Sequence, residues 1–365
     1  MAGDRGILIA GGYGHVGRLI AADLAPRYPG RVVVAGRNGG RAGALANEIG
    51  YGVRGLKLDV ADAAAVERAL DGIELVICCL DQEEPHLLRS AVKRGLAYTD
   101  LSAEFNFWSA ARELDEEAKQ SGARVLLGAG LIPGLSSVMA RDAVDRTGPA
   151  GSLDIGILLS VGDSFGPAAL DWMIGAAGRT LTITENGRAR RVRGMGDRRR
   201  MAFPNSASVR NVYRFALPDQ VFYPETLGVQ RAGSWVALEP SWVGAMFTVS
   251  VRSGLAGTLY RTRLRRGMTR ALQWLQRRYA GRDTYVLSVE AEGPEGTAGL
   301  GVVNRNESRG TATSAAVMAD ALYAGGETAP CGIAPGVSLP EQVFEPAPFF
   351  ASLDRRGIGV QRDPA

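Results

Sequence analysis

Histidine, cysteine and lysine are scarce in this chain of 365 residues. The two histidines, His15 and His86, are too few for a multi-histidine metal site, and a Ser-His-Asp triad would have to use one of them. We therefore expect no metal site and little hydrolytic chemistry. Cys78 and Cys79 are adjacent in an apolar run, where neighbouring side chains of a strand point to opposite faces and do not join. This cysteine usage predicts a reducing, cytoplasmic location.

Long apolar runs are also absent. No stretch approaches the roughly 20 apolar residues that a membrane-spanning helix needs, and residues Met1 to Arg5 lead into a strand-like segment without the pattern of an export signal. The 42 basic residues nearly balance the 38 acidic ones, which argues against nucleic acid as the partner. We expect a small-molecule substrate, no nucleic acid and no integral membrane association.

The composition, with 46% hydrophobic residues, is that of a globular protein. The length of the chain predicts two domains. Short β-branched runs alternate with helical patterns along the first part of the chain, which predicts an α/β domain with a doubly wound parallel sheet of the Rossmann type. The expected strands are Gly6–Ala10, Arg31–Ala35, Gly55–Val60, Leu75–Leu80, Ala97–Leu101 and Arg124–Gly128.

From Pro133 the pattern changes to that of an α+β domain. Its predicted strands include Leu153–Ser160, Thr180–Thr184, Phe247–Val251 and Tyr285–Ala291. We expect a Rossmann domain over residues 1–132, an α+β substrate and dimerisation domain over 133–304, and a C-terminal segment, 305–365, that packs back on the Rossmann domain.

A glycine-rich loop joins the first predicted strand to the first predicted helix. In the run Gly12-Tyr13-Gly14-His15-Val16-Gly17, the three glycines satisfy the spacing GxGxxG. In this pattern the first glycine permits a tight turn, the second lets the backbone approach a pyrophosphate, and the third allows close packing of helix on strand. Because the helix N-terminus offers free N–H donors, this context predicts a dinucleotide site, with His15 near the pyrophosphate.

The end of the second predicted strand indicates which dinucleotide is bound. An NAD site has a carboxylate here for the ribose 2′-hydroxyl, whereas this chain has Gly36, Arg37 and Asn38. A guanidinium can pair bidentately with a 2′-phosphate. The sequence therefore favours NADP over NAD, although Arg37 could also be an ordinary solvated arginine.

Other residues follow the strands that lead to the same edge of the sheet. Asp59 and Val60 close the third predicted strand and should lie near the adenine. Cys79, Leu80 and Asp81 close the fourth, at the switch point where the ribose and nicotinamide should pass.

Two further segments resemble a known family. The run Tyr98-Thr99-Asp100-Leu101-Ser102 and the run Gly128 to Leu135, which reads GAGLIPGL, resemble the saccharopine dehydrogenase superfamily, which includes saccharopine reductase, carboxynorspermidine dehydrogenase and homospermidine synthase. The C-terminal run from Gly332 to Phe350 fits the same family. The resemblance implies NAD(P)H-dependent reduction of an imine, or the reverse oxidation of an amine, with substrate held between the domains of a homodimer.

The chain departs from the family at the crossing into the second domain. Ile132 stands where saccharopine reductases commonly have an aspartate, and this change removes a partner for a substrate ammonium group. The substrate is therefore expected to differ from saccharopine and from polyamines, in a role within specialised metabolism.

Hydride transfer needs one proton donor beside the cofactor. Asp100 and Asp81 close neighbouring predicted strands and are the candidate general acids. The alternative for Asp100 is a structural carboxylate that accepts hydrogen bonds from nearby backbone N–H groups, and for Asp81 a polar loop residue.

Other functions remain open. Reduction of a carbonyl or an activated C=C bond of a bulky apolar substrate is one, and a catalytically inactive NADP-binding sensor is another. A basic amphipathic segment, Arg263–Tyr279, could dock an acidic carrier protein, but such a pattern is more often a domain helix with a solvated face.

Overall fold

The structure, a computed structural model, describes residues 6–81, 85–163, 172–173, 175–204, 209–254, 270, 274, 276–279, 283–325, 328–329 and 332–362. It divides into two compact units. Unit 1 comprises Met1–Val138 and Thr311–Gly357, and unit 2 comprises Met139–Gly310 and Ile358–Ala365. The domain boundaries that the sequence predicts, after residues 132 and 304, are a separate matter from this division and stay predictions. The basic segment Arg263–Tyr279 lies largely outside the described residues.

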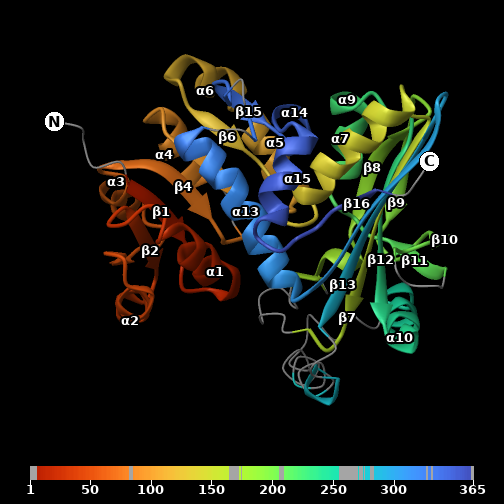
Figure 1. Cartoon of the computed structure of the whole chain (residues 1–365), viewed down its shortest axis with the longest axis horizontal. Helices are drawn as coiled ribbons and strands as arrows, with labels where there is room; N and C mark the ends of the chain where they lie inside the picture. Colours follow the sequence, from red (N-terminus) through yellow and green to blue (C-terminus); the bar gives the residue numbers. More distant parts are fainter. Residues whose placement is uncertain are drawn as a thin grey trace. The chain divides into compact units, whose positions relative to one another are not determined.

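Unit 1 contains a seven-stranded sheet in the order β15-β6-β5-β4-β1-β2-β3 (Figure 1). Every pairing in it is parallel. The strands are β1 (Gly6–Ala10), β2 (Val32–Gly36), β3 (Arg54–Lys57), β4 (Ile73–Cys78), β5 (Ala97–Asp100), β6 (Arg124–Leu126) and β15 (Gly336–Ser338). The strand order reverses between β1 and β4, which is where a doubly wound sheet binds its ligand.

Helices α1 (His15–Leu24), α2 (Gly39–Ile49), α3 (Ala63–Ala69), α4 (His86–Lys93), α5 (Phe105–Arg112) and α6 (Asp115–Ser121) connect the first six strands, and α14 (Pro340–Val343) and α15 (Pro346–Asp354) follow β15. Helix α7 (Leu135–Thr147) begins in unit 1 and ends in unit 2, and α13 (Glu307–Ala324) begins in unit 2 and ends in unit 1. All residues of β1 and β2 are buried, as expected for parallel strands with both faces covered. The predicted α/β fold class and the first six predicted strands are confirmed, with ends shifted by a few residues.

Unit 2 contains a second seven-stranded sheet, in the order β10-β11-β12-β7-β13-β14-β16. Within it β12 and β7 pair in parallel, and the other pairs are antiparallel. Its strands are β7 (Ser152–Ser160), β10 (Arg198–Met201), β11 (Arg210–Arg214), β12 (Ala232–Glu239), β13 (Thr284–Gly293), β14 (Gly296–Arg305) and β16 (Gln361–Arg362). Unit 2 also contains a separate hairpin, β8 (Thr180–Glu185) and β9 (Arg188–Arg193), and the helices α9 (Asp219–Thr226) and α10 (Ser241–Arg252).

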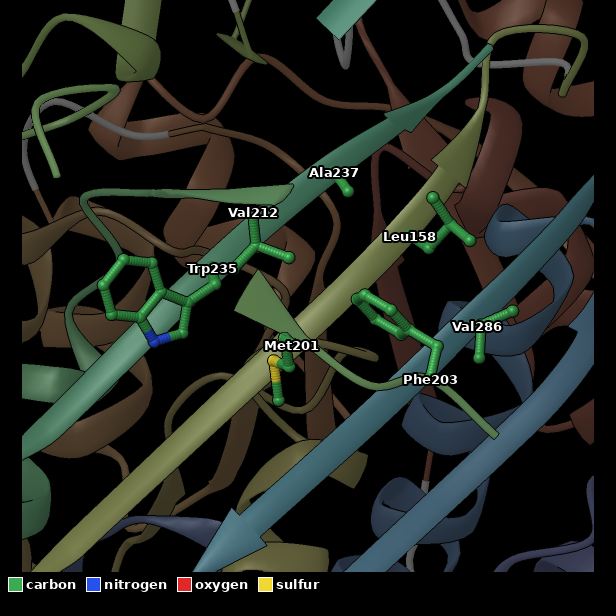
Figure 2. Close-up of a cluster of buried hydrophobic side chains, with 7 residues drawn as sticks. All are labelled: Leu158, Met201, Phe203, Val212, Trp235, Ala237 and Val286. Carbon is green, nitrogen blue, oxygen red and sulfur yellow. The ribbon is translucent and has the colours of Figure 1, made fainter. Parts of the chain in front are cut away.

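An apolar cluster covers one face of this second sheet. Leu158 of β7 lies opposite Ala237 of β12 and Val286 of β13, so three strands contribute one residue each to the same row. Met201 and Phe203 pack over this row (Figure 2). The segment after β9 is thereby anchored to the sheet by its apolar residues.

The strand predicted at Phe247–Val251 is wrong, because these residues lie in helix α10. Their β-branched composition suggested a strand. The tertiary contacts favour a helix, since Val243, Gly244, Thr248 and Val251 are its buried residues and recur at helical spacing. The Arg-dense run of residues 188–200 forms β9 and most of β10.

Candidate functional site

The glycine loop lies between β1 and α1, at the switch point of the parallel sheet. Gly11 has φ +78°, a conformation that favours glycine. A Cβ on Gly12 would lie 3.0 Å from the Cα of Val34 in β2, and one on Gly17 would lie 2.5 Å from the carbonyl oxygen of Gly11. These glycines therefore let the turn pack against the sheet and the helix against the turn, as GxGxxG requires.

The N-terminus of α1 is left open. Its N-cap residue, Gly14, has no side chain to cap the first turn, and both Gly14 and His15 are exposed. The N–H groups of His15, Val16 and Gly17 begin the helix, where no intrahelical acceptor is available. This helix end can hold an anion such as a pyrophosphate.

Tyr13 connects this loop to the end of β2. Its hydroxyl accepts a hydrogen bond from the backbone N–H of Asn38 at 3.0 Å, and its ring lies against Gly36, where a Cβ would overlap it. The guanidinium of Arg41 lies 4.6 Å from the centre of the Tyr13 ring. Asn38 caps α2 through its side chain, which accepts from the Arg41 N–H at 3.0 Å.

The exposed end of β2 carries positive charge and no carboxylate. Arg37 is exposed directly after the strand, and Arg41 lies in the first turn of α2. Sequence reasoning named Arg37 but missed Arg41. The signal was its spacing of four residues from Arg37 and its place in a helix capped by Asn38.

The other predicted cofactor residues occupy different positions along the sheet edge. Cys79 donates its N–H to the carbonyl of Ala10 at 2.9 Å, and a Cβ on Gly11 would lie 2.8 Å from Cδ2 of Leu80. Cys79 and Leu80 thus border the glycine loop. Asp59 is exposed after β3 and accepts a hydrogen bond from the N–H of Ala61 at 3.1 Å, with Val60 half-buried beside it.

Asp100 is the last residue of β5 and pairs in register with Cys78 of β4. Its side chain is 1% exposed. One oxygen, Oδ1, accepts from the N–H groups of Ser102 at 2.9 Å and Gly128 at 3.3 Å. The other, Oδ2, is buried without a hydrogen-bond partner.

Burial has the larger influence on this carboxyl group. It raises the pKa of Asp100 to about 7, and the two backbone hydrogen bonds act in the opposite direction. Asp100 therefore accepts backbone hydrogen bonds, as a structural carboxylate would, and its role as a general acid stays a prediction.

The other candidates differ from Asp100 in their surroundings. Asp81 is exposed, three residues beyond the end of β4. Burial raises the pKa of the Cys78 thiol to about 12, so this cysteine is no nucleophile at neutral pH. His86 is exposed at the start of α4. Within the described part of the chain, no three His, Cys, Asp or Glu side chains are grouped to hold a metal ion.

None of the described helices is both long enough and apolar enough to span a membrane.

Comparisons with known proteins bear on the fold and on the N-terminal part of the chain. Residues 7–126 match the family model of the saccharopine dehydrogenase NADP binding domain. The apo saccharopine dehydrogenase (L-Glu forming) of Saccharomyces cerevisiae is similar in fold, with a TM-score of 0.67 at 16% identity, covering 99% of this chain and 100% of that one. The homospermidine synthase of Legionella pneumophila, solved in complex with NAD, has a TM-score of 0.68 at 13% identity, covering 98% and 91%.

One curated protein matches over a short stretch. The polyketide synthase ThaG of Burkholderia thailandensis is 47% identical over 73 residues, which is 18% of this chain and 1% of that protein's length.

Proposed function

We propose that this chain is an oxidoreductase of the saccharopine dehydrogenase type that uses NADPH to reduce a C=N bond of a small molecule, and the match of residues 7–126 to the saccharopine dehydrogenase NADP binding domain supports this proposal. The observation that carries the proposal is Asp100. It is a buried carboxyl group with a pKa of about 7 and one unpaired oxygen, at the carboxyl end of a strand beside the switch point.

The residues present fit this cofactor. The N–H groups at the start of α1 would hold the pyrophosphate, with Cys79 and Leu80 closing the other side of the loop. Arg37 and Arg41 would pair with the 2′-phosphate. The cofactor, when bound, supplies the hydride.

The protein supplies the proton. With a pKa of about 7, the Asp100 carboxyl group is partly protonated at neutral pH, and in the proposed reaction it would donate this proton to the imine nitrogen. The carboxylate that remains keeps its two backbone hydrogen bonds from Ser102 and Gly128, which stabilise its charge. A proton from solvent then restores the acid.

The substrate is proposed as a small metabolite of specialised metabolism. The 73-residue match to a protein named as a polyketide synthase supports that setting. The homodimer and the cytoplasmic location remain predictions from the sequence.

The test is turnover with NADPH deuterated at C4, using a panel of cyclic imines, ketones and activated alkenes. Mass spectrometry of the products would find deuterium on the carbon of a new amine if the proposal holds. Deuterium found only in alcohols would indicate carbonyl reduction, and deuterium found only in saturated products would indicate C=C reduction. Tight NADPH binding without turnover of any class would favour the inactive sensor.

A further inference from the structure

An arginine-lined pocket of about 560 Å³ opens on unit 2. Six arginines line it: Arg190 of β9, Arg198 and Arg199 of β10, Arg214 of β11, Arg231 directly before β12, and Arg252 of α10. Only two carboxylates, Glu185 and Asp197, line it with them. We call this site the arginine pocket. The volume is that of a small-molecule site.

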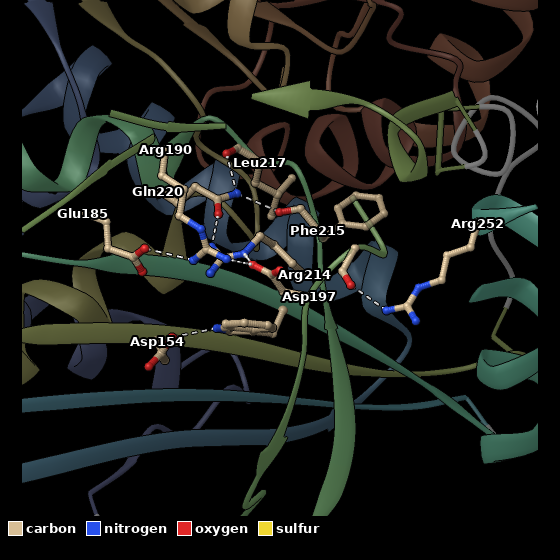
Figure 3. Close-up of polar contacts among 11 residues, drawn as sticks. Asp154, Glu185, Arg190, Asp197, Arg214, Phe215, Leu217, Gln220 and Arg252 are labelled. Atoms are coloured by element: carbon tan, nitrogen blue, oxygen red, sulfur yellow. Dashed lines mark hydrogen bonds and ion pairs between the residues drawn. The ribbon is translucent and has the colours of Figure 1, made fainter. Parts of the chain in front are cut away.

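At its base lies a buried guanidinium held in a fixed orientation. Arg214 is 2% exposed, and its guanidinium carbon lies 4.5 Å from the centre of the Trp235 ring. It donates to Asp197 at 2.9 Å and to Oε1 of Gln220 at 2.8 Å (Figure 3). The amide of Gln220 donates in turn to the carbonyls of Phe215 and Leu217, at 2.7 and 3.0 Å.

The indole below is fixed as well. Trp235 donates its ring N–H to Oδ1 of Asp154 at 2.7 Å. The guanidinium of Arg199 lies 5.6 Å from the centre of the same ring and pairs with Asp154. The base of the pocket is therefore ordered before any ligand arrives, which lowers the entropy cost of binding.

Negative charge in and around the pocket is shared between guanidinium groups. Asp197 serves Arg190 at 3.1 Å as well as Arg214 at 2.9 Å. Asp154 serves Arg231 at 3.3 Å as well as Arg199. These two carboxylates each face two cations, whereas Arg190 also pairs with Glu185 at 2.9 Å and Arg199 also pairs with Glu290 at 3.7 Å.

Two more arginines add charge that no carboxylate balances. Arg252 donates to the carbonyls of Met195 and Gly196, at 2.7 and 2.6 Å, and neither acceptor is charged. Arg198 makes no ion pair with any residue that the structure describes. Burial also lowers the pKa of Arg214, so its cation is incompletely compensated in this setting.

We propose that the arginine pocket binds a small molecule through an oxyanion group, either a carboxylate or a phosphate. Guanidinium groups match both through paired N–H donors. A bound oxyanion would balance the charge of Arg198 and Arg252, the two lining arginines that pair with no carboxylate among the residues that the structure describes. The proposal goes beyond the proposed reduction and needs no cofactor, because all the residues that line the pocket belong to unit 2.

The experiment is calorimetric titration of the full chain with inorganic phosphate and, separately, with succinate, at constant ionic strength. The variant Arg252→Gln removes an exposed guanidinium from the pocket. The matched control is Arg200→Gln, a neighbouring exposed arginine of β10 that does not line it. Arg214→Lys tests the fork geometry while keeping the charge.

We expect saturable binding of at least one anion, weakened about tenfold in Arg252→Gln, and unchanged in Arg200→Gln. Stronger binding of phosphate would indicate a phosphorylated ligand, and stronger binding of succinate a carboxylate ligand. An anion held at the glycine loop of unit 1 would lose no affinity in Arg252→Gln, so equal affinities in wild type and in this variant overturn the proposal. Absence of saturable binding of both anions also overturns it. Neither outcome bears on imine reduction.

Discussion

The hydroxyl of Tyr13 accepts a hydrogen bond from the backbone N–H of Asn38 at 3.0 Å, and this contact joins the phosphate loop to the end of β2. The Tyr13 ring fills the space over Gly36 and carries the Arg41 guanidinium above it. The part of the site that would meet a pyrophosphate and the part that would meet a ribose phosphate are thus connected by one side chain.

Replacing Gly36 with alanine tests this packing. Because the new Cβ would overlap the Tyr13 ring, we expect Gly36→Ala to lower the free energy of unfolding by about 1–3 kcal/mol. The loss should shrink in a Tyr13→Ala background, where the ring is gone. Chemical denaturation of the four proteins measures it, with Gly43→Ala, a helical position with open space around it, as the control. A loss of equal size in both backgrounds would contradict the overlap.

We predict that Arg37 and Arg41 set a preference for NADPH over NADH. We expect Arg37→Ser and Arg41→Ser each to weaken NADPH binding about tenfold or more, since each removes a charge-assisted contact to the 2′-phosphate. NADH binding should change little. Fluorescence titration with both cofactors measures the ratio, with Arg54→Ser on β3 as an exposed control. An equal loss of affinity for NADPH and NADH would contradict the proposed contact of these arginines with the 2′-phosphate.

Asp100 predicts the pH dependence of the reaction. Its pKa of about 7 means that the proton donor is present below pH 7 and is lost as the pH rises above it. We expect kcat/KM for imine reduction to fall above pH 7 in the wild type. Asp100→Asn should be slower by about 10²–10⁴-fold and lack this fall. If Asp81→Asn removed the fall instead, Asp81 would be the donor.

The same carboxyl group predicts a pH effect on stability. The pKa of Asp100 is higher in the folded chain than its usual value of 3.8, so between these values the folded state binds the proton more than the unfolded state does. Stability contributed by this group is therefore present below pH 3.8 and is lost as the pH rises through about 7. Thermal unfolding of Asp100→Asn should depend less on pH across this window than that of the wild type. If the unfolding temperatures of the wild type and Asp100→Asn changed equally with pH, the Asp100 carboxyl group would be ionised throughout this range.

Asp154 supports the second sheet. It is 3% exposed and binds Trp235 and the two arginines Arg199 and Arg231. Asp154→Ala would leave a buried indole N–H and two guanidinium groups without this partner, and we expect a loss of about 3–5 kcal/mol in the free energy of unfolding. Asp154→Asn should lose less, because its amide oxygen still accepts the indole hydrogen bond. Denaturant unfolding of the two variants compares them.

The sequence predicted the parallel sheet and the phosphate loop well, because both are local signals. Strands buried on both faces appear as short apolar runs, as in Ile7–Ile9 and Val32–Val34. Glycine spacing marks the loop between β1 and α1 directly. The position of Asp100 at the end of β5 was predicted for the same reason, and the carboxyl end of such a strand is the edge of the sheet where ligands bind.

The arginine pocket could not be predicted in this way. Asp154, Arg199 and Trp235 lie on three strands, and they meet only because the sheet runs in the order β10-β11-β12-β7. The sequence alone shows residues 188–200 as an arginine-rich segment, and it does not indicate which residues these arginines contact. Helix α10 was missed for a related reason, since its buried face depends on contacts with β12 that local propensity does not report.

The parallel sheet of unit 1 is completed by β15, a strand that is synthesised only after the whole of Met139–Gly310. β15 adds to the edge of the sheet beside β6, and Asp320 of α13 binds Arg27 and Tyr28, which follow α1. A ribosome therefore delivers all of Met139–Gly310 before unit 1 receives its last strand and this helix. The unit that carries the glycine loop must wait, with part of its apolar surface uncovered, until the chain has returned to it.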